Sequence, residues 1–195
     1  MTVVELRRYR LRPGRRDELV DLFERELVAP QEAVGMAVLA TFTDADEPDH
    51  FVWLRGFADL ATRDAGLRAF YGGPVWATHG PAANATMLDS DDVHLLRPVG
   101  ELSFDDAHAG AVLVTITAEG AAPAIPGGRR LAHLETEPSP NSFPRLPVHT
   151  KQVTVALTAF DDLDRLDATL ATAPPPADGE ARARLVPTPG SRLGR

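Results

Sequence analysis

The same strand-to-helix pattern occurs twice, once in each half of the chain. Each copy runs through a phenylalanine, Phe57 or Phe160, into an Asp-Leu pair of the kind that starts a helix. With these phenylalanines superposed, six further pairs fall into register: Leu54 with Leu157, Asp59 with Asp162, Leu60 with Leu163, Asp64 with Asp167, Ala65 with Ala168, and Leu67 with Leu170. Residues 94–98 also resemble residues 183–187. An internal duplication on this scale predicts two related structural units.

The first unit, residues 1–100, reads as β-α-β-β-α-β, the ferredoxin-like order. Its strand patterns cover residues 3–12, 36–43, 50–57 and 93–98. Its helix patterns begin near Asp17 and end near Pro30, and again cover residues 59–70. The stretch 72–92 contains several glycines and prolines, so we expect a long loop there.

The second unit, residues 101–195, is degenerate. Strand patterns cover residues 111–118 and 129–136, and only EGAAPAIPGG separates them. That segment is too short and too rich in proline and glycine for a helix of several turns. We therefore expect the second unit to lack its first helix, and a loop, a neighbouring subunit or a ligand to cover the sheet there.

Two four-stranded sheets that carry helices on one face can bury their other faces only against each other. The fold class predicted is α+β, with tandem ferredoxin-like repeats forming an eight-stranded antiparallel barrel. Such a barrel has room inside for side chains or one small ligand. The sequence leaves open whether the barrel closes within one chain or between two.

Composition excludes some classes of function. The net charge of −8 disfavours a nucleic-acid partner, which requires a concentrated basic surface. No apolar run approaches the roughly 20 residues that cross a membrane, and the N-terminus lacks the apolar block of a signal peptide. There is no cysteine, so no disulfide or thiolate metal site exists. We expect a cytoplasmic protein.

Three segments carry a resemblance to a known family: VVELRRYRLRPGRRDEL, the stretch from HFVWLRGFADL to VHLLRP, and TEPSPNSFPRLPV. They resemble the NIPSNAP family of the dimeric α/β-barrel superfamily. The resemblance implies a barrel with a pocket, and we expect a homodimer. Barrel relatives include cofactor-free monooxygenases and polyketide-modifying enzymes, so the resemblance implies no single reaction.

The strong catalytic and cofactor motifs are missing from the sequence. It contains no G-x-S-x-G, Walker or dinucleotide-binding pattern, and its six histidines never form H-x-H or H-E-x-x-H. We therefore expect no cofactor and no metal; the alternative is a metal held by histidines and carboxylates from distant positions. The aspartates at 89, 91 and 92 lack the glycine and terminal glutamate of a calcium loop, which favours a solvated turn.

The segment around His79 is the first candidate site. Trp76, His79, Asn84 and Met87 gather on the expected loop, and loops at a barrel mouth are where sites usually lie. His79 is the expected catalytic residue, because its ordinary pKa suits a general base near neutral pH. The alternative is structural, with Trp76 packed over the second helix and His79 bonded to the loop backbone.

Two further groups are candidate substrate-binding residues. Glu5, Arg7 and Tyr9 share one side of the first strand, where they could orient a carbonyl or phenol inside a barrel. The alternative is a row of cross-strand ion pairs or a solvated face. The loop 138–148 is stiffened by prolines and brings together Asn141, Arg145 and the adjoining His149, either as a pocket wall or as a cover for the sheet.

Two functions remain open from the sequence. The first is a barrel that binds an apolar, oxygenated small molecule as a cofactor-independent enzyme of oxygenase, cyclase or isomerase type in bacterial small-molecule metabolism. The second is a non-catalytic module that binds a ligand or another protein through the sheet face left bare by the missing helix.

Overall fold

The computed structural model describes residues 1–104, 108–118 and 125–194, and its strands form one closed antiparallel barrel. The first half supplies β1 (Val3–Leu11), α1 (Arg16–Leu22), the π-helical turn η1 (Phe23–Leu27), α2 (Val28–Ala33), β2 (Ala37–Asp44), β3 (His50–Phe57), α3 (Leu60–Tyr71), α4 (Pro74–Thr86) and β4 (Met87–Pro98). The second half supplies β5 (Ala111–Thr117), β6 (Arg129–Thr136), β7 (Thr154–Phe160), α5 (Leu163–Leu170), β8 (Glu180–Pro187) and the 3-10 turn η2 (Arg192–Gly194).

The barrel order is β1-β3-β2-β8-β5-β7-β6-β4, so each half contributes one four-stranded sheet in the ferredoxin-like order. The two sheets meet along short seams. β2 pairs with β8 over Phe42, Thr43 and Asp44 only, and β4 pairs with β6 over three residues that end at Pro98. The expected α+β barrel is confirmed, and it closes within a single chain.

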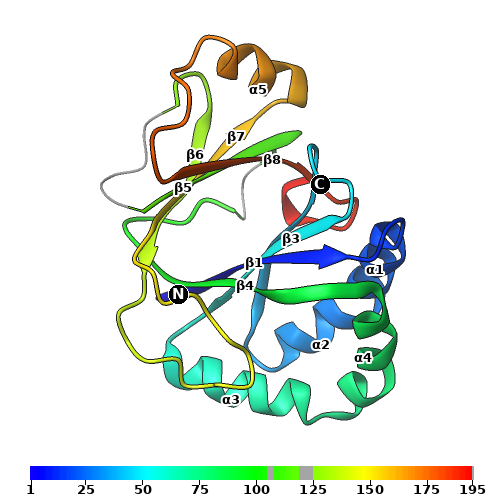
Figure 1. Ribbon diagram of the computed structural model, residues 1–195. Helices are drawn as coiled ribbons and strands as arrows, with labels where there is room; N and C mark the ends of the chain where they lie inside the picture. Colours follow the sequence, from blue (N-terminus) through cyan, green and yellow to red (C-terminus); the bar gives the residue numbers. More distant parts are fainter. Residues whose placement is uncertain (105–107, 119–124, 195) are drawn as a thin grey trace.

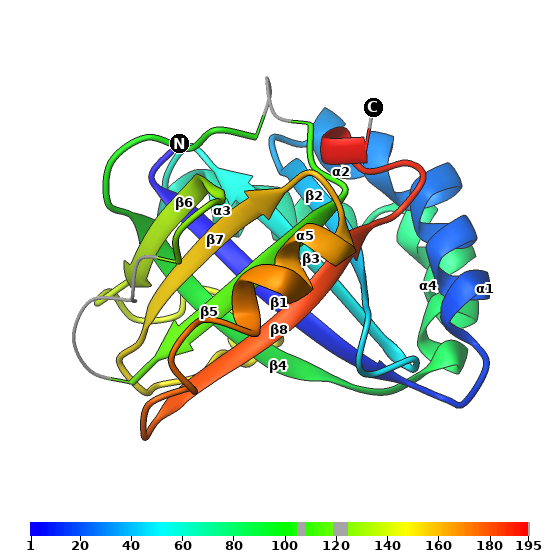
Figure 2. The ribbon, with the colours of Figure 1, turned by 90° about the horizontal axis from the view of Figure 1, so that it is seen from above.

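The helices cover the two halves unequally. Helices α1 to α4 lie on one side of the barrel, while α5 lies on the opposite side, over β7 and β8 (Figures 1 and 2). The helices of the first half cover an apolar layer on the outer face of β1 to β4, and a smaller cluster around Phe160 and Leu166 lies under α5. No helix of the described residues is long and apolar enough to cross a membrane.

The barrel interior is packed with aliphatic side chains at one end. Alternate residues of each strand point inward, as the two-residue period of a strand requires. Val4, Leu96 and Leu134 fill this end of the barrel, and Phe104 and Leu193 pack against the same cluster.

The duplication seen in the sequence reappears in the helix caps. The side chain of Asp59 accepts a hydrogen bond from the backbone N–H of Thr62 at the start of α3, and that of Asp162 accepts one from Arg165 at the start of α5, both at 2.7 Å. Each carboxylate satisfies a backbone donor that the first turn of a helix leaves free.

The strand registers extend the same correspondence. Leu6 pairs with Leu54, and Val114 pairs with Leu157. Because Leu54 and Leu157 are equivalent in the two halves, Leu6 and Val114 are equivalent as well.

The prediction of a long loop over residues 72–92 is wrong. Residues 74–86 form α4, and β4 begins immediately afterwards at Met87. Pro74 occupies the first helical turn, where its missing N–H costs nothing, and Gly80 packs so closely on the Trp76 indole that a Cβ would approach its ring to 2.7 Å. Pro74 starts the helix and Gly80 allows the close contact with Trp76, while Pro81 lies inside α4. The solvated turn expected at residues 89–92 is likewise part of β4.

The helix expected after Asp17 is found, but it is interrupted. After about two α-helical turns it becomes π-helical at residues 23–27, and it continues past Pro30 to Ala33. A proline has no N–H for the carbonyl four residues earlier, so regular α-helical bonding cannot run through this point.

Between β5 and β6 the described residues, 118 and 125–128, are not helical. Residues 119–124 lie outside the described part of the chain. The missing first helix of the second unit, and the boundary between residues 100 and 101, stay predictions.

Candidate functional site

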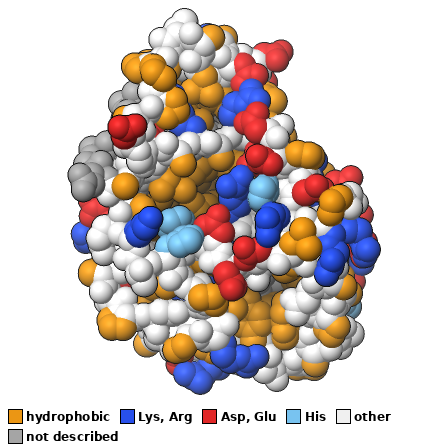
Figure 3. All heavy atoms as spheres, viewed as in Figure 1, with side chains coloured by type: hydrophobic (Ala, Val, Ile, Leu, Met, Phe, Trp, Pro, Cys, Tyr) orange, Lys and Arg blue, Asp and Glu red, His pale blue; other side chains and the backbone are white. Residues whose placement is uncertain are grey.

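A cavity of about 250 Å³ borders the packed cluster inside the barrel, with Leu6, Val52, Val114 and Leu185 belonging to both. Its apolar wall comes from both halves of the chain: Leu6, Val52, Val114, Ile116, Ala181, Ala183 and Leu185. Its polar lining residues are Arg8, Asp92, His94 and Arg182. A hollow with hydrophobic side chains inside and charged side chains and histidines around it is visible in Figure 3.

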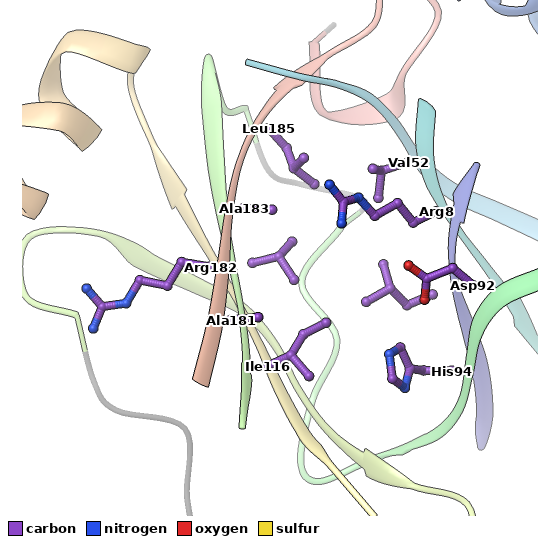
Figure 4. Close-up of a pocket in the computed structure, with 11 residues that line it drawn as sticks. Arg8, Val52, Asp92, His94, Ile116, Ala181, Arg182, Ala183 and Leu185 are labelled. Carbon is purple, nitrogen blue, oxygen red and sulfur yellow. The ribbon is translucent and has the colours of Figure 1, made fainter. Parts of the chain in front are cut away.

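Strand alternation places the polar residues in the cavity. Arg8 follows Leu6 by two residues on β1, and His94 follows Asp92 by two residues on β4, so each pair shares the inner face of its strand. Arg8, Asp92 and His94 lie on one side of the cavity, whereas the Arg182 guanidinium is directed away from it (Figure 4). Arg182 is bound to Glu180 and to the carbonyl of Pro174.

Arg8 is only partly engaged by the protein. Its Nη2 lies 3.4 Å from Oδ2 of Asp44, a weak contact, while Oδ1 of Asp44 accepts hydrogen bonds from the backbone of residues 46 and 47. The buried Nε of Arg8 has no hydrogen-bond partner among the described residues. An unpaired buried donor is costly, so this atom is available to an acceptor in the cavity.

The histidine pair at the cavity rim joins β4 to the loop that follows β6. The backbone N–H of His149 donates to the carbonyl of Val93 at 2.8 Å, which ties the end of the loop to β4. The His149 Nε2 atom lies 2.8 Å from Oδ1 of Asp92, and the rings of His94 and His149 are 4.6 Å apart. Burial, together with the neighbouring His149, lowers the pKa of His94 to about 4, so its imidazole is neutral at neutral pH.

The polar residues have apolar counterparts in the other half. By the strand registers, Ile116 is the residue equivalent to Arg8. By the alignment of residues 94–98 with 183–187, Ala181 and Ala183 are equivalent to Asp92 and His94. All of these residues line the cavity. The polar groups directed at the cavity therefore come from the first half, whereas the side chains at the equivalent positions of the second half are apolar.

Glu5, Arg7 and Tyr9 lie on the other face of β1. They are buried between the barrel and its helices, so none of them lines the cavity. The cross-strand ion pair weighed as the alternative is present, since Glu5 pairs with Arg55 on β3.

The Glu5 carboxylate is the centre of a buried charge network. Its oxygens accept hydrogen bonds from Arg7 at 2.7 Å, Arg55 at 2.8 Å and Arg63 at 2.6 Å. Burial raises the pKa of Glu5, but the charges of Arg55, Arg7 and Arg63 outweigh it and hold this pKa well below its ordinary value. Arg7 Nε also donates to the Tyr9 hydroxyl at 3.0 Å.

Asn141 connects this network to the loop that carries His149. Its Oδ1 accepts hydrogen bonds from Nη1 of Arg63 at 3.0 Å and from the backbone of Phe143, and its amide donates to the carbonyl of Leu146. Asn141 therefore shapes the loop without lining the cavity, and Arg145 on the same loop is exposed.

The residues expected around His79 lie on α4 and at the start of β4. Trp76 packs against Phe70 and Tyr71 of α3, which agrees with the structural alternative for this residue. His79 is half-buried, with Nε2 3.7 Å from Oε2 of Glu26. Asn84 is exposed, and Met87 packs on the apolar layer under the helices.

The structure thus brings none of the nine predicted site residues to the cavity wall. The catalytic role of His79 stays a prediction. Sequence reasoning missed Arg8, Asp92 and His94, and it named His149 only as a polar residue at the end of the loop 138–148. The signal for the first three was present, because Arg8 is in register with the inward Leu6, and D-x-H at residues 92–94 is a same-face pair in a strand.

Comparison with known proteins places the chain in a family. The NIPSNAP family model matches residues 4–101. No curated protein matches the chain. A NIPSNAP-like domain protein of Burkholderia xenovorans matches with 28% identity and a TM-score of 0.47, over 51% of this chain and 86% of its own. A "putative monooxygenase" of Fusobacterium nucleatum matches with 9% identity and a TM-score of 0.60, over 95% of this chain and 92% of its own. One from Lactobacillus acidophilus matches with 10% identity and a TM-score of 0.57, over 95% and 93%. The last two share the barrel fold.

Proposed function

Since this chain belongs to the NIPSNAP family, we propose that its barrel binds a small apolar molecule that carries an acceptor oxygen. The unpaired buried Nε of Arg8, a residue that lines a largely apolar cavity, carries this proposal. The apolar body of the ligand lies against the wall formed by the second half, and its oxygen accepts a hydrogen bond from Arg8. A charge-assisted hydrogen bond of this kind fixes the ligand's orientation.

The cavity limits the size of the ligand. An engineered apolar cavity of about 150 Å³ holds benzene. The cavity here, about 250 Å³, has room for a substituted aromatic ring or an aliphatic chain of similar bulk. Simple phenols, aromatic acids and aromatic ketones therefore fit better than large polycyclic compounds.

The test is ligand binding by calorimetry, with a panel of aromatic acids and phenols and the matching hydrocarbons. Ala183→Phe fills the cavity and should abolish binding of the whole panel. Ala168→Phe, on the exposed face of α5, is the matched control and should bind as the wild type does. Arg8→Met should weaken binding of the oxygenated compounds at least about tenfold and leave the hydrocarbons unchanged, since about 1.4 kcal/mol corresponds to a factor of ten. Normal binding by folded Ala183→Phe would contradict the proposal.

The proposal extends to catalysis at the polar end of the cavity. A reaction of oxygenase, cyclase or isomerase type requires a group that moves a proton or activates an oxygen next to the ligand. Asp92 and His94 are the side chains in position to do so. Turnover that is lost in His94→Gln but retained in His79→Ala would support this assignment, and the reverse would support His79.

The non-catalytic interaction module is less favoured by the exposed surface. Among the described residues, the large hydrophobic side chains that are exposed are Met1, Leu88 and Val99, all in the first half. The outer face of β8 carries Arg182 and Arg184, both in ion pairs.

Native mass spectrometry of protein purified from a cell extract would detect any retained ligand and would test the expected homodimer in one measurement.

A further inference from the structure

We propose that Asp92, His94 and His149 form a binding site for a divalent first-row transition-metal ion at the rim of the barrel cavity. This goes beyond the proposed function, which names an organic ligand and no metal. It also departs from the expectation of no metal and no cofactor, against which a metal held by residues from distant positions was the less favoured alternative.

The three side chains converge from two parts of the chain. Asp92 and His94 share the inner face of β4, and the backbone bond from His149 to Val93 brings the third residue beside them. One donor atom from each residue can be chosen so that all three lie within 4.8 Å of one another. Two ligands of a tetrahedral metal at about 2.0–2.1 Å are about 3.3 Å apart, so modest side-chain rotation closes the site.

The side chains have the freedom that this rotation needs. Those of Asp92 and His149 are 43% and 44% exposed, while the backbone around both is fixed by hydrogen bonds to neighbouring strands or loop. The present hydrogen bond between His149 and Asp92 would be exchanged for two metal–ligand bonds.

The donor set identifies the class of metal. Two imidazoles and one carboxylate suit zinc and divalent iron, cobalt, nickel or manganese, whereas calcium and magnesium prefer oxygen ligands alone. Three protein ligands leave at least one coordination position open, which is the arrangement of catalytic metal sites.

The open position faces the cavity, because Asp92 and His94 line it (Figure 4). A metal held there would act as a Lewis acid on an oxygen of the bound compound, on the same side of the cavity as Arg8. This consequence rests on the proposed function. The binding of the metal itself rests on the three side chains alone.

The test is titration of chelator-stripped protein with Zn²⁺ by calorimetry, and with Co²⁺ by absorption spectroscopy. The wild type should bind one ion per chain. Asp92→Asn and His149→Ala should each weaken binding at least about tenfold, and His94→Gln likewise, since each removes one of three ligands. His133→Ala, a half-buried histidine between inward-facing residues of β6, is the control and should bind as the wild type does.

Several outcomes separate this inference from the proposed function. Equal zinc affinity in the wild type, Asp92→Asn and His149→Ala, with normal circular dichroism, would overturn the metal site. So would an equal loss of affinity in His133→Ala. Metal binding without any binding of the organic panel would uphold this inference and defeat the proposed function, and ligand binding by a protein that takes up no metal would do the opposite.

Discussion

Glu5 and Arg55 face each other across β1 and β3, with both side chains fully buried and Nε of the arginine 2.8 Å from Oε2 of the glutamate. Arg7 and Arg63 share the same carboxylate. The corresponding positions of the second half, Leu113 and Thr158, carry no charge. The network thus belongs to the half of the barrel that four helices cover, where water cannot solvate the arginines.

Glu5→Gln should destabilise the protein by about 3–5 kcal/mol, because it leaves three buried guanidinium groups without their carboxylate. Urea unfolding followed by circular dichroism measures this change in free energy. The control is Glu135→Gln, which breaks the exposed ion pair with Arg97 and should cost less than about 1 kcal/mol. Similar losses in the two variants would show that the buried network adds little.

The same carboxylate predicts how stability depends on pH. The native pKa of Glu5 lies below its ordinary value of 4.5, so the unfolded chain binds this proton at a higher pH than the native chain does. The stability due to Glu5 is therefore fully present above that ordinary value and is lost as pH falls below it. Urea midpoints between about pH 6 and pH 3 should fall less steeply for Glu5→Gln than for the wild type. Parallel curves would contradict the prediction.

The second helix cap offers a smaller test. Asp162→Ala removes the hydrogen bond to the backbone N–H of Arg165 and should cost about 1 kcal/mol. Asp161→Ala, one residue before the cap and likewise exposed, is the control and should change the free energy of unfolding far less. If the two variants unfold alike, the cap on α5 is not stabilising.

Asn141 should control the order of the loop that ends at His149. Asn141→Ala removes the acceptor of Arg63 and leaves a buried guanidinium less satisfied, so we expect a cost of about 1–3 kcal/mol. Amide hydrogen exchange of residues 138–149 should also accelerate. Ser142→Ala, which removes only a 3.4 Å contact to the same arginine, should leave both measurements almost unchanged.

His79→Ala tests the role expected from the sequence. The residue lies on α4 and does not line the cavity, so ligand affinity measured by calorimetry should stay within about twofold of the wild type. A tenfold loss would show that α4 contributes to the site. The half-exposed position makes the variant safe for folding, which thermal unfolding can confirm.

Periodicity predicted the strands well, because the inward residues of a barrel must alternate with residues that contact helices or water. It failed at α4, where glycine and proline indicate loops in general but here serve a helix start and a close contact with Trp76. The expected barrel was confirmed, yet Glu5, Arg7 and Tyr9 lie outside it. A strand pattern tells which residues share a face, but only the position of the helices tells which face is inside.

The site was missed for a related reason. Asp92 and His94 are neighbours on one strand, but His149 reaches them only because the loop after β6 fills the gap beside the short β4–β6 seam. No local pattern encodes a contact across 57 residues of chain.

The fusion of both sheets into one chain has a consequence for how a ligand is held. Two identical subunits closing a barrel would present every inner residue twice, and a ligand could enter in either of two equivalent orientations. Here the positions equivalent to Arg8, Asp92 and His94 carry Ile116, Ala181 and Ala183, so the polar groups of the cavity are not repeated in the second half. Because both halves belong to one chain, their inner residues can differ, so a ligand of the proposed kind should bind in a single orientation, with its polar end toward Arg8.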